Sequence, residues 1–204
     1  MYTALLATSQ TLQAFIQNRL ENDLNLRTFF NSALGGTMIV SVRNSEEMSE
    51  RNEQGLSMWL YRVTRDEDRL NDPPERLSPF LERQPPLPLR LHYLFTPVVD
   101  PTTANNAEVE QSVLGKVLQS LYGHPLFKGA DLAGDFIGTQ TEIRARMEPM
   151  SLEDITRVWN ALEQPYHLSI SYEVTLVRID SEEFDPVSPV LIAEPKFAVI
   201  VGES

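Results

Sequence analysis

The stretch 151–180 changes its hydrophobic period at one proline, and this change constrains the fold more than any other feature of the sequence. Before Pro165, apolar residues recur at helical spacing, which predicts a helix. Ser151 and Asp154 can form a capping box at its start. Pro165 lacks an N–H and therefore ends the helix. After it the period becomes two, which predicts a half-buried central strand over 166–176. The apolar positions are Leu152, Ile155, Val158, Trp159 and Leu162 in the helix, then Tyr166, Leu168, Ile170, Tyr172, Val174 and Leu176; His167, Ser169, Ser171, Glu173 and Thr175 form the strand's polar face.

The same periods predict two more helices and four more strands. A helix over 3–20 has an apolar stripe that a partner helix or a membrane surface could also use, but its polar side lacks Lys and Arg, which favours core packing. A second helix, over 105–122, is capped by Asn105 or Asn106 and ended by Gly123. The strands are expected at 37–42, 56–63, 87–95 and 143–148.

Three connections look irregular. The segment 43–55 is charged and rich in turn residues, and 128–138 is a second loop. The segment 65–88 contains charges and paired prolines, which exclude a regular element of any length. Because long unstructured connections are more often functional than idle, 65–88 is a candidate contact loop.

These elements predict one α/β or α+β domain, with a mixed, mainly antiparallel sheet of about five strands packed by helices at 3–20, 105–122 and 151–163. We expect this domain to occupy 1–180 and an extended C-terminal tail to follow over 181–204. Prolines in the tail exclude a helix, and its segment 197–201 has the composition of a strand that needs a sheet edge.

Composition excludes several classes of function. The net charge of -12, from 29 acidic against 17 basic residues, opposes binding to a phosphate backbone, so no nucleic-acid partner is expected. The chain has no cysteine, which fits a reducing cytosol. No signal peptide is recognisable, and no apolar run approaches the roughly 20 residues that a membrane span needs. We therefore expect a soluble protein that is made in the cytoplasm and does not itself span a membrane.

No motif of a catalytic, cofactor or metal site is found. His92, His124 and His167 lie too far apart for a metal-ligand motif, and His167 is expected to be solvent-facing or hydrogen-bonded on the strand's polar face. Nucleophile-elbow, phosphate-loop and dinucleotide fingerprints are all missing. The sequence therefore predicts no enzyme, no cofactor and no metal.

One acidic cluster follows the central strand. Its carboxylates could gather a calcium ion, but the glycine and ligand order of the known twelve-residue loop are missing, which favours a solvated turn. A hydrolase that uses these carboxylates stays as an alternative. The cluster consists of Asp180, Glu182, Glu183 and Asp185.

Four segments of the sequence (called phrases below) resemble segments of one protein family, and they occur in the same order as in that family. They are LSMWLYRV at 56–63, LRLHYLFTP at 89–97, LGKVLQSLYGHPLF at 114–127 and EPMSLEDITRVWNALEQPYHLSISYEVTLVRID at 148–180. The chain resembles the cap, or tail-terminator, proteins of extracellular phage-tail-like contractile injection systems. The phrases are structural and contain no catalytic signature.

The resemblance implies a structural role. It implies a ring, expected to be a homo-hexamer because contractile tails have sixfold symmetry, on the tube end distal to the baseplate. Such a ring ends tube polymerisation and holds the last sheath ring, so its partners are itself, the inner-tube protein and the sheath protein. The protein would belong to an assembled particle that is released or anchored. Another baseplate or sheath-associated adaptor of the same particle is the alternative.

The tail is the predicted partner-binding segment. Residues 187–201 are expected to add as a strand to a neighbouring subunit or to sheath, because a solvated apolar strand would promote aggregation. Docking of the tail on its own sheet is equally compatible with the sequence. The predicted partner-binding residues are Val190, Leu191, Ile192, Phe197, Val199 and Val201.

Overall fold

The structure, a computed structural model, describes residues 1–70 and 73–187. Its main sheet has six strands in the order β1-β2-β5-β8-β7-β6, of which β1 and β2 are parallel and all other neighbours antiparallel. The predicted α+β fold with a mixed, mainly antiparallel sheet is confirmed. The strands are β1 (Ile39–Ser41), β2 (Gly55–Arg65), β5 (Leu87–Val98), β6 (Leu126–Lys128), β7 (Glu142–Met147) and β8 (Ile170–Ile179).

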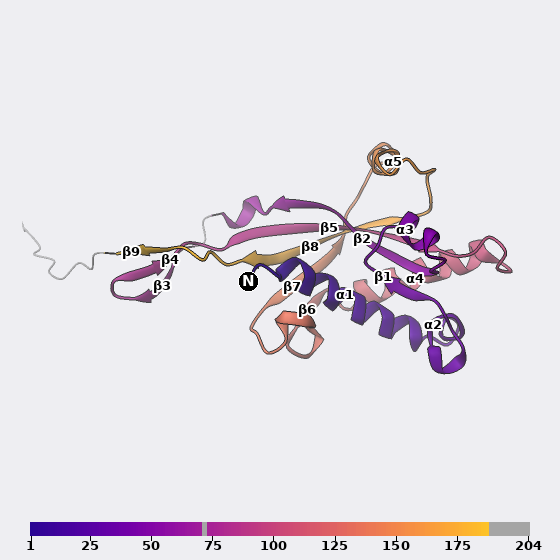
Figure 1. Cartoon of the computed structure of the whole chain (residues 1–204), viewed down its shortest axis with the longest axis horizontal. Helices are drawn as coiled ribbons and strands as arrows, with labels where there is room; N and C mark the ends of the chain where they lie inside the picture. Colours follow the sequence, from indigo (N-terminus) through magenta and orange to yellow (C-terminus); the bar gives the residue numbers. More distant parts are fainter. Residues whose placement is uncertain (71–72, 188–204) are drawn as a thin grey trace, which may run out of the picture.

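Helices cover both faces of this sheet (Figure 1). The main core lies between one face and the helices α1 and α4, and it includes buried residues such as Ile16, Val117 and Tyr93. On the other face, Ile155 and Trp159 of α5 pack against Leu94 of β5 in a smaller cluster. The helices are α1 (Ala4–Glu21), α2 (Arg27–Phe30), α3 (Ser45–Glu50), α4 (Asn106–Gly123) and α5 (Leu152–Ala161).

Side chains of α1 hold the edge strand β1. The amide of Gln13 donates to the Val40 carbonyl at 2.7 Å, and the Val40 N–H donates to the Gln17 side chain at 2.7 Å. On the core side, the hydroxyls of Ser9 and Tyr93 lie 2.8 Å apart and join α1 to β5. The backbone of Val40 is therefore not open to another strand.

The central strand differs from its prediction. It begins at Ile170, and Tyr166 and Leu168 lie before it with 49% and 43% of their surface exposed. A register shift opposite β5 breaks the two-residue period, so that Val174 and Val177 both lie in the core. Its polar face is covered rather than solvated, because α5 lies over that side of the sheet.

The segment 43–55 is not only a loop, because it contains α3. The side chain of Asn44 accepts the N–H of Glu47 at 2.8 Å and caps the helix, and Met48 is fully buried. Periodicity did not reveal α3 because Met48 is its one apolar residue. In 128–138 the structure has two short 3-10 turns, Gly129–Asp131 and Gly134–Phe136.

The prediction that 65–88 contains no regular element is wrong. The strands β3 (Glu75–Ser78) and β4 (Leu81–Arg83) form a hairpin there, and β9 (Phe184–Pro186) adds to β4 in a second sheet of order β3-β4-β9. The prolines lie outside the hairpin's strands: Pro74 precedes β3, Pro79 is in the turn and Pro85 follows β4. Paired prolines therefore bracket short strands here and do not exclude them.

Candidate functional site

The three-stranded sheet of β3, β4 and β9, named the arm below, projects from one end of the main sheet (Figure 1). Its apolar side chains are largely exposed: the exposed fractions are 43% for Leu77, 63% for Phe80, 37% for Leu81 and 47% for Phe184. A small sheet needs a buried hydrophobic face for stability, and exposed apolar groups of this kind mark interaction sites. The arm is therefore a candidate partner-binding element.

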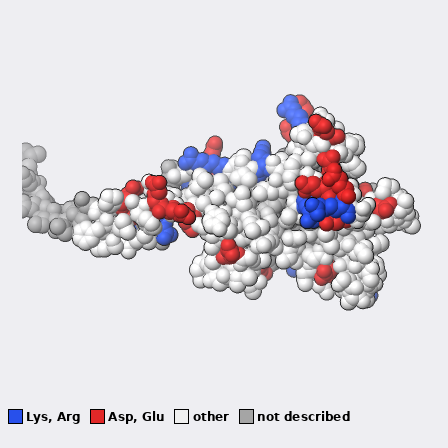
Figure 2. All heavy atoms as spheres, viewed as in Figure 1, with Lys and Arg blue, Asp and Glu red and all other residues white. Residues whose placement is uncertain are grey.

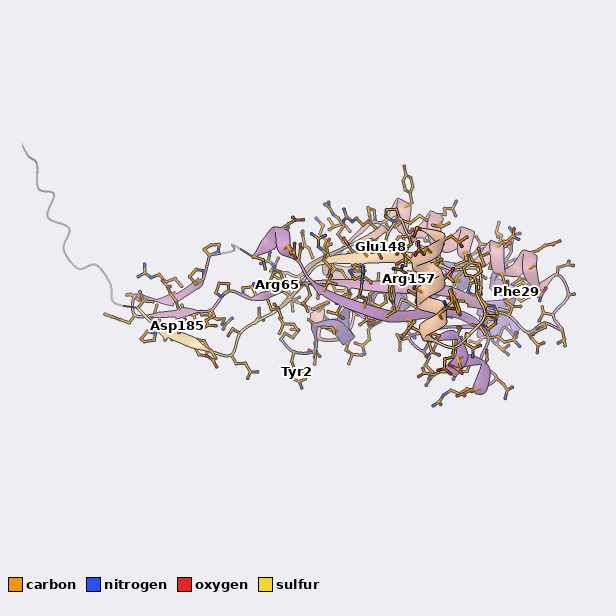
Figure 3. All side chains as sticks on the ribbon, turned by 90° about the horizontal axis from the view of Figure 1, so that it is seen from above. Tyr2, Phe29, Arg65, Glu148, Arg157 and Asp185 are labelled. Carbon is orange, nitrogen blue, oxygen red and sulfur yellow. The ribbon has the colours of Figure 1, made fainter. Side chains whose placement is uncertain are left out.

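Charged side chains accompany the arm but do not form a site. In Figure 2, acidic and basic side chains gather over α3 and α5 and along the arm. Arg83 lies over the Phe184 ring at 5.7 Å, and the Gln84 amide donates to Asp185 at 3.3 Å. These contacts join β4 to β9, and Figure 3 shows Asp185 far from Glu148 and Arg157 of the main body.

The predicted partner-binding residues lie outside the described part of the chain. These are Val190, Leu191, Ile192, Phe197, Val199 and Val201. The last described residue is Val187, whose N–H donates to the carbonyl of Phe80 at 3.0 Å. The last described residue therefore lies at the arm, beside the turn of the β3–β4 hairpin.

The acidic cluster at 180–185 is dispersed within the described residues. Asp180 forms an ion pair with the N-terminal ammonium group at 3.0 Å, whereas Asp185 lies in β9. Within 1–70 and 73–187, none of these carboxylates belongs to a group of three that could hold one ion. The geometry supports neither a calcium loop nor a hydrolytic pair at this place.

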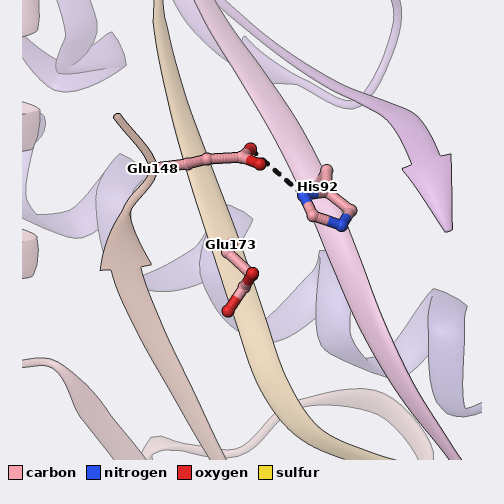
Figure 4. A group of neighbouring side chains, drawn as sticks. All are labelled: His92, Glu148 and Glu173. Carbon is pink, nitrogen blue, oxygen red and sulfur yellow. Dashed lines mark hydrogen bonds and ion pairs between the residues drawn. The ribbon is translucent and has the colours of Figure 1, made fainter. Parts of the chain in front are cut away.

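A second cluster lies on the sheet face that α5 covers, and the sequence analysis missed it. His92 of β5, Glu173 of β8 and Glu148, which follows β7, offer ligand atoms within 4.8 Å of one another (Figure 4). His92 is 2% exposed and Glu173 is 6% exposed. The three residues are distant in sequence, and only the pairing of neighbouring strands brings them together, so no spacing motif could reveal them.

Both ring nitrogens of His92 have polar partners. Nδ1 lies 3.1 Å from a carboxylate oxygen of Glu148 and 3.1 Å from a guanidinium nitrogen of Arg62. Nε2 lies 3.0 Å from the Thr64 hydroxyl. The imidazole is therefore held between β2 and the residue that follows β7.

The carboxylate of Glu148 is held in its charged form. Burial alone would raise its pKa, but hydrogen bonds from Ser171, at 2.7 Å, and from His92, together with the charges of His92 and Arg62, lower the pKa below its usual value. Arg62 also donates to Glu148 at 2.9 Å. Glu148 thus contributes a stabilising negative charge at neutral pH.

Three arginines neutralise the two carboxylates of this cluster. Arg62 pairs with Glu148, whereas Arg146 lies 2.9 Å and Arg90 3.8 Å from Glu173. A divalent cation would therefore have to compete with cations that already pair with its ligands. The arrangement fits an ion-pair network that holds β2, β5, β7 and β8 together, since a buried charge is costly unless it is paired.

The other two histidines have separate environments. His124 lies 3.1 Å from the Asp131 carboxylate and stacks on Phe15. His167 is exposed as predicted, but it precedes β8 and lies 5.3 Å from the Trp159 ring instead of on the strand's polar face.

A family model for the Pvc16 N-terminal domain matches residues 7–192 of this chain. The chain belongs to the Pvc16 N-terminal domain family. Membership confirms the family resemblance drawn from the four sequence phrases. No curated protein matches the chain.

Two solved structures share the fold of this Pvc16-family chain. The first is the sheath/tube terminator of PVC, an extracellular contractile injection system, in its extended state, with TM-score 0.62 and 16% identity; the match covers 98% of this chain and 65% of that one. The second is the tube-terminating cap of the anti-feeding prophage, AFP, with TM-score 0.53 and 20% identity; it covers 88% of this chain and 62% of the other. The chain thus spans less than two thirds of the length of either neighbour.

None of the helices in the described ranges 1–70 and 73–187 is long and apolar enough to cross a membrane.

Proposed function

We propose that this Pvc16-family chain is the structural cap of a contractile injection system, which ends the inner tube and holds the last sheath ring. The observation that supports this most strongly is the fold match over 98% of the chain to a sheath/tube terminator. Because identity is low, the match supports the function only together with family membership and the arm's exposed apolar groups.

The cap acts as a closed ring of identical copies. A single chain does not cover a ring-shaped tube end, and closed cyclic assembly is the usual solution for identical subunits. Six copies match the sixfold symmetry of contractile tails. In this proposal the partners are the neighbouring copies, the inner-tube protein and the sheath protein, and the protein is not an enzyme.

Location follows from this role. The protein is made in the cytoplasm and becomes part of an assembled particle, released or anchored, at the tube end distal to the baseplate. The net charge of -12 is compatible with a particle that holds protein cargo and no genome.

The tail, residues 181–204 in the predicted division, connects the domain 1–180 to its partners. The described chain leaves the arm at Val187, so apolar residues beyond it can pair with a sheet edge of another subunit or of sheath. Deletion of 187–204 tests this. A truncated protein that stays folded but no longer caps the tube or retains sheath supports a partner role, whereas a protein that unfolds assigns the segment to its own core.

Negative-stain imaging of particles assembled without this protein tests the cap function. We expect tubes of irregular length or ragged distal ends, because nothing stops the addition of tube rings. Particles of normal length that lack a baseplate would instead identify an adaptor. Normal particles with both ends intact would refute a structural role at the tube end.

A further inference from the structure

An apolar groove lies between the C-terminal half of α4 and the end of β7. Its volume is about 550 Å³. Tyr122 on its rim is 90% exposed and Met147 is 54% exposed, which is unusual for large apolar side chains that face a common space. We name it the α4–β7 groove; it is lined by Leu118, Gln119, Leu121, Tyr122, Pro125, Ala145, Arg146, Met147 and Tyr172.

An open strand edge borders this groove. The pairing of β6 with β7 ends at Arg144, and the Ala145 N–H donates to the Pro125 carbonyl at 2.9 Å. Met147, two residues further on, presents its backbone to the same side as Ala145. It pairs with Tyr172 on the β8 side, but among the described residues it has no strand partner on the β6 side.

The two edges of the main sheet therefore differ. At β1 the backbone of Val40 is bonded to Gln13 and Gln17 of α1, which prevents strand addition there. At β7, within 1–70 and 73–187, Met147 has no strand partner on the β6 side, so an added strand can begin there.

Tyr172 places one hydrogen-bonding group in the groove. Its side chain is 4% exposed and lines the groove, and its hydroxyl makes no hydrogen bond within 1–70 and 73–187 but is not a fully buried unpaired atom, so it remains open to water. Burial of the side chain raises the pKa of this phenol, so the hydroxyl keeps its proton and can donate to the carbonyl of an added strand.

We propose that residues 197–201 of a second copy of this chain occupy the α4–β7 groove as a strand added along β7. This inference rests on the proposed ring-shaped cap and names the site that receives each tail. In an extended segment, Phe197, Val199 and Val201 share one face and can enter the apolar groove together. Main-chain bonds to β7 give affinity, and the groove selects these side chains.

The position of Val187 favours a second copy over the same chain. Phe197 follows Val187 by 10 residues, which span at most roughly 33–36 Å when extended. Val187 lies at the arm, which Figure 1 shows projecting away from the body that contains α4 and β7. A contact from the tail of one copy to the groove of the next is heterologous, and such contacts form a ring when the rotation between copies closes.

Disulfide trapping tests the proposal directly, because the chain has no native cysteine. The test variant combines Gln119→Cys, at the exposed rim of the groove, with Val199→Cys in the tail. It is examined as free protein and in assembled particles, by non-reducing electrophoresis and mass spectrometry. We expect a ladder of dimers and higher multimers that collapses to monomer on reduction. The matched control pairs Val199→Cys with Ser112→Cys, which is exposed on α4 but does not line the groove, and gives no ladder.

Every other outcome overturns the proposal. An intramolecular disulfide would show that the chain's own tail fills the groove. A bond to a different particle protein would assign the tail to that partner, and absence of any disulfide would mean that the groove does not receive the tail. Failure here is distinct from failure of the cap function, because particles assembled without the protein would still show irregular lengths.

A second variant changes the apolar lining of the groove and leaves the tail unchanged. Met147→Glu places a charge at an exposed position, so the fold should remain intact. We expect at least a tenfold weaker self-association by analytical ultracentrifugation and loss of the disulfide ladder. Unchanged association would contradict the proposal.

Discussion

Trp159→Ala should undock α5 from the sheet. Trp159 is 1% exposed and packs with Leu94 and Ile155 in the small cluster on that face, where its indole N–H donates to the Ser169 hydroxyl at 3.2 Å. The cluster is separate from the main core, so its few buried side chains must supply the apolar stabilisation of α5.

The expected loss follows from the size of the buried side chain. Truncation of a buried Trp to Ala typically costs about 3–5 kcal/mol, and a domain of this kind has roughly 5–15 kcal/mol of total stability. We expect about 3 kcal/mol, at the low end, because undocking of α5 limits the loss to the free energy of its docking. Trp159→Phe keeps most of the apolar surface and loses one hydrogen bond, for about 1 kcal/mol.

Urea unfolding followed by circular dichroism measures these differences. Leu152→Ala is the matched control on the same helix, since Leu152 is 72% exposed and its truncation should change stability by less than about 0.5 kcal/mol. If Trp159→Ala lowers the free energy of unfolding by less than about 1 kcal/mol, α5 is not docked as described and does not cover the ionic cluster.

Two other predictions concern the ionic cluster and the sheet edge. Because hydrogen bonds and nearby positive charge lower the pKa of Glu148 in the folded state below 4.5, its stabilisation is full above that pH and is lost as pH falls through the folded pKa. Glu148→Gln should therefore lower the melting temperature more at pH 7 than at pH 3, and an equal effect at both would contradict the network. Gly55→Ala should cost at least about 2 kcal/mol, because φ is +131° and a Cβ would lie 2.1 Å from the Ile39 carbonyl oxygen. Gly115→Ala, in open space within α4, should instead stabilise by up to about 1 kcal/mol in the same thermal melts, and similar effects for both would refute the close approach of β1 and β2.

Periodicity predicted the long elements because each buries one continuous face. The helices α1 and α4 and the strands β2, β5 and β7 lie within a few residues of their expected positions. The start of β8 was predicted too early, because Tyr166 and Leu168 have strand-like spacing and propensity. The chain turns first, with a positive φ of 55° at Glu163, and this turn is not visible in a hydrophobic pattern.

Short elements and contacts between side chains on different strands could not be predicted from the sequence. Strands of three or four residues, as in the arm, are too short to show a period, and their prolines resembled those of a loop. Glu173 was assigned only to the polar face of its strand and His92 to no site, because no period states which face of a sheet a helix such as α5 will cover. The family resemblance, by contrast, needed no geometry, since it rests on whole phrases of sequence.

Cryo-electron microscopy of complete particles tests the central claim most directly. A reconstruction of both ends, with this protein located by an inserted epitope tag, should show it as one closed ring on the tube end distal to the baseplate, in contact with the last tube and sheath rings. Density for the tag at the baseplate, along the sheath, or as a single copy per particle would contradict the account.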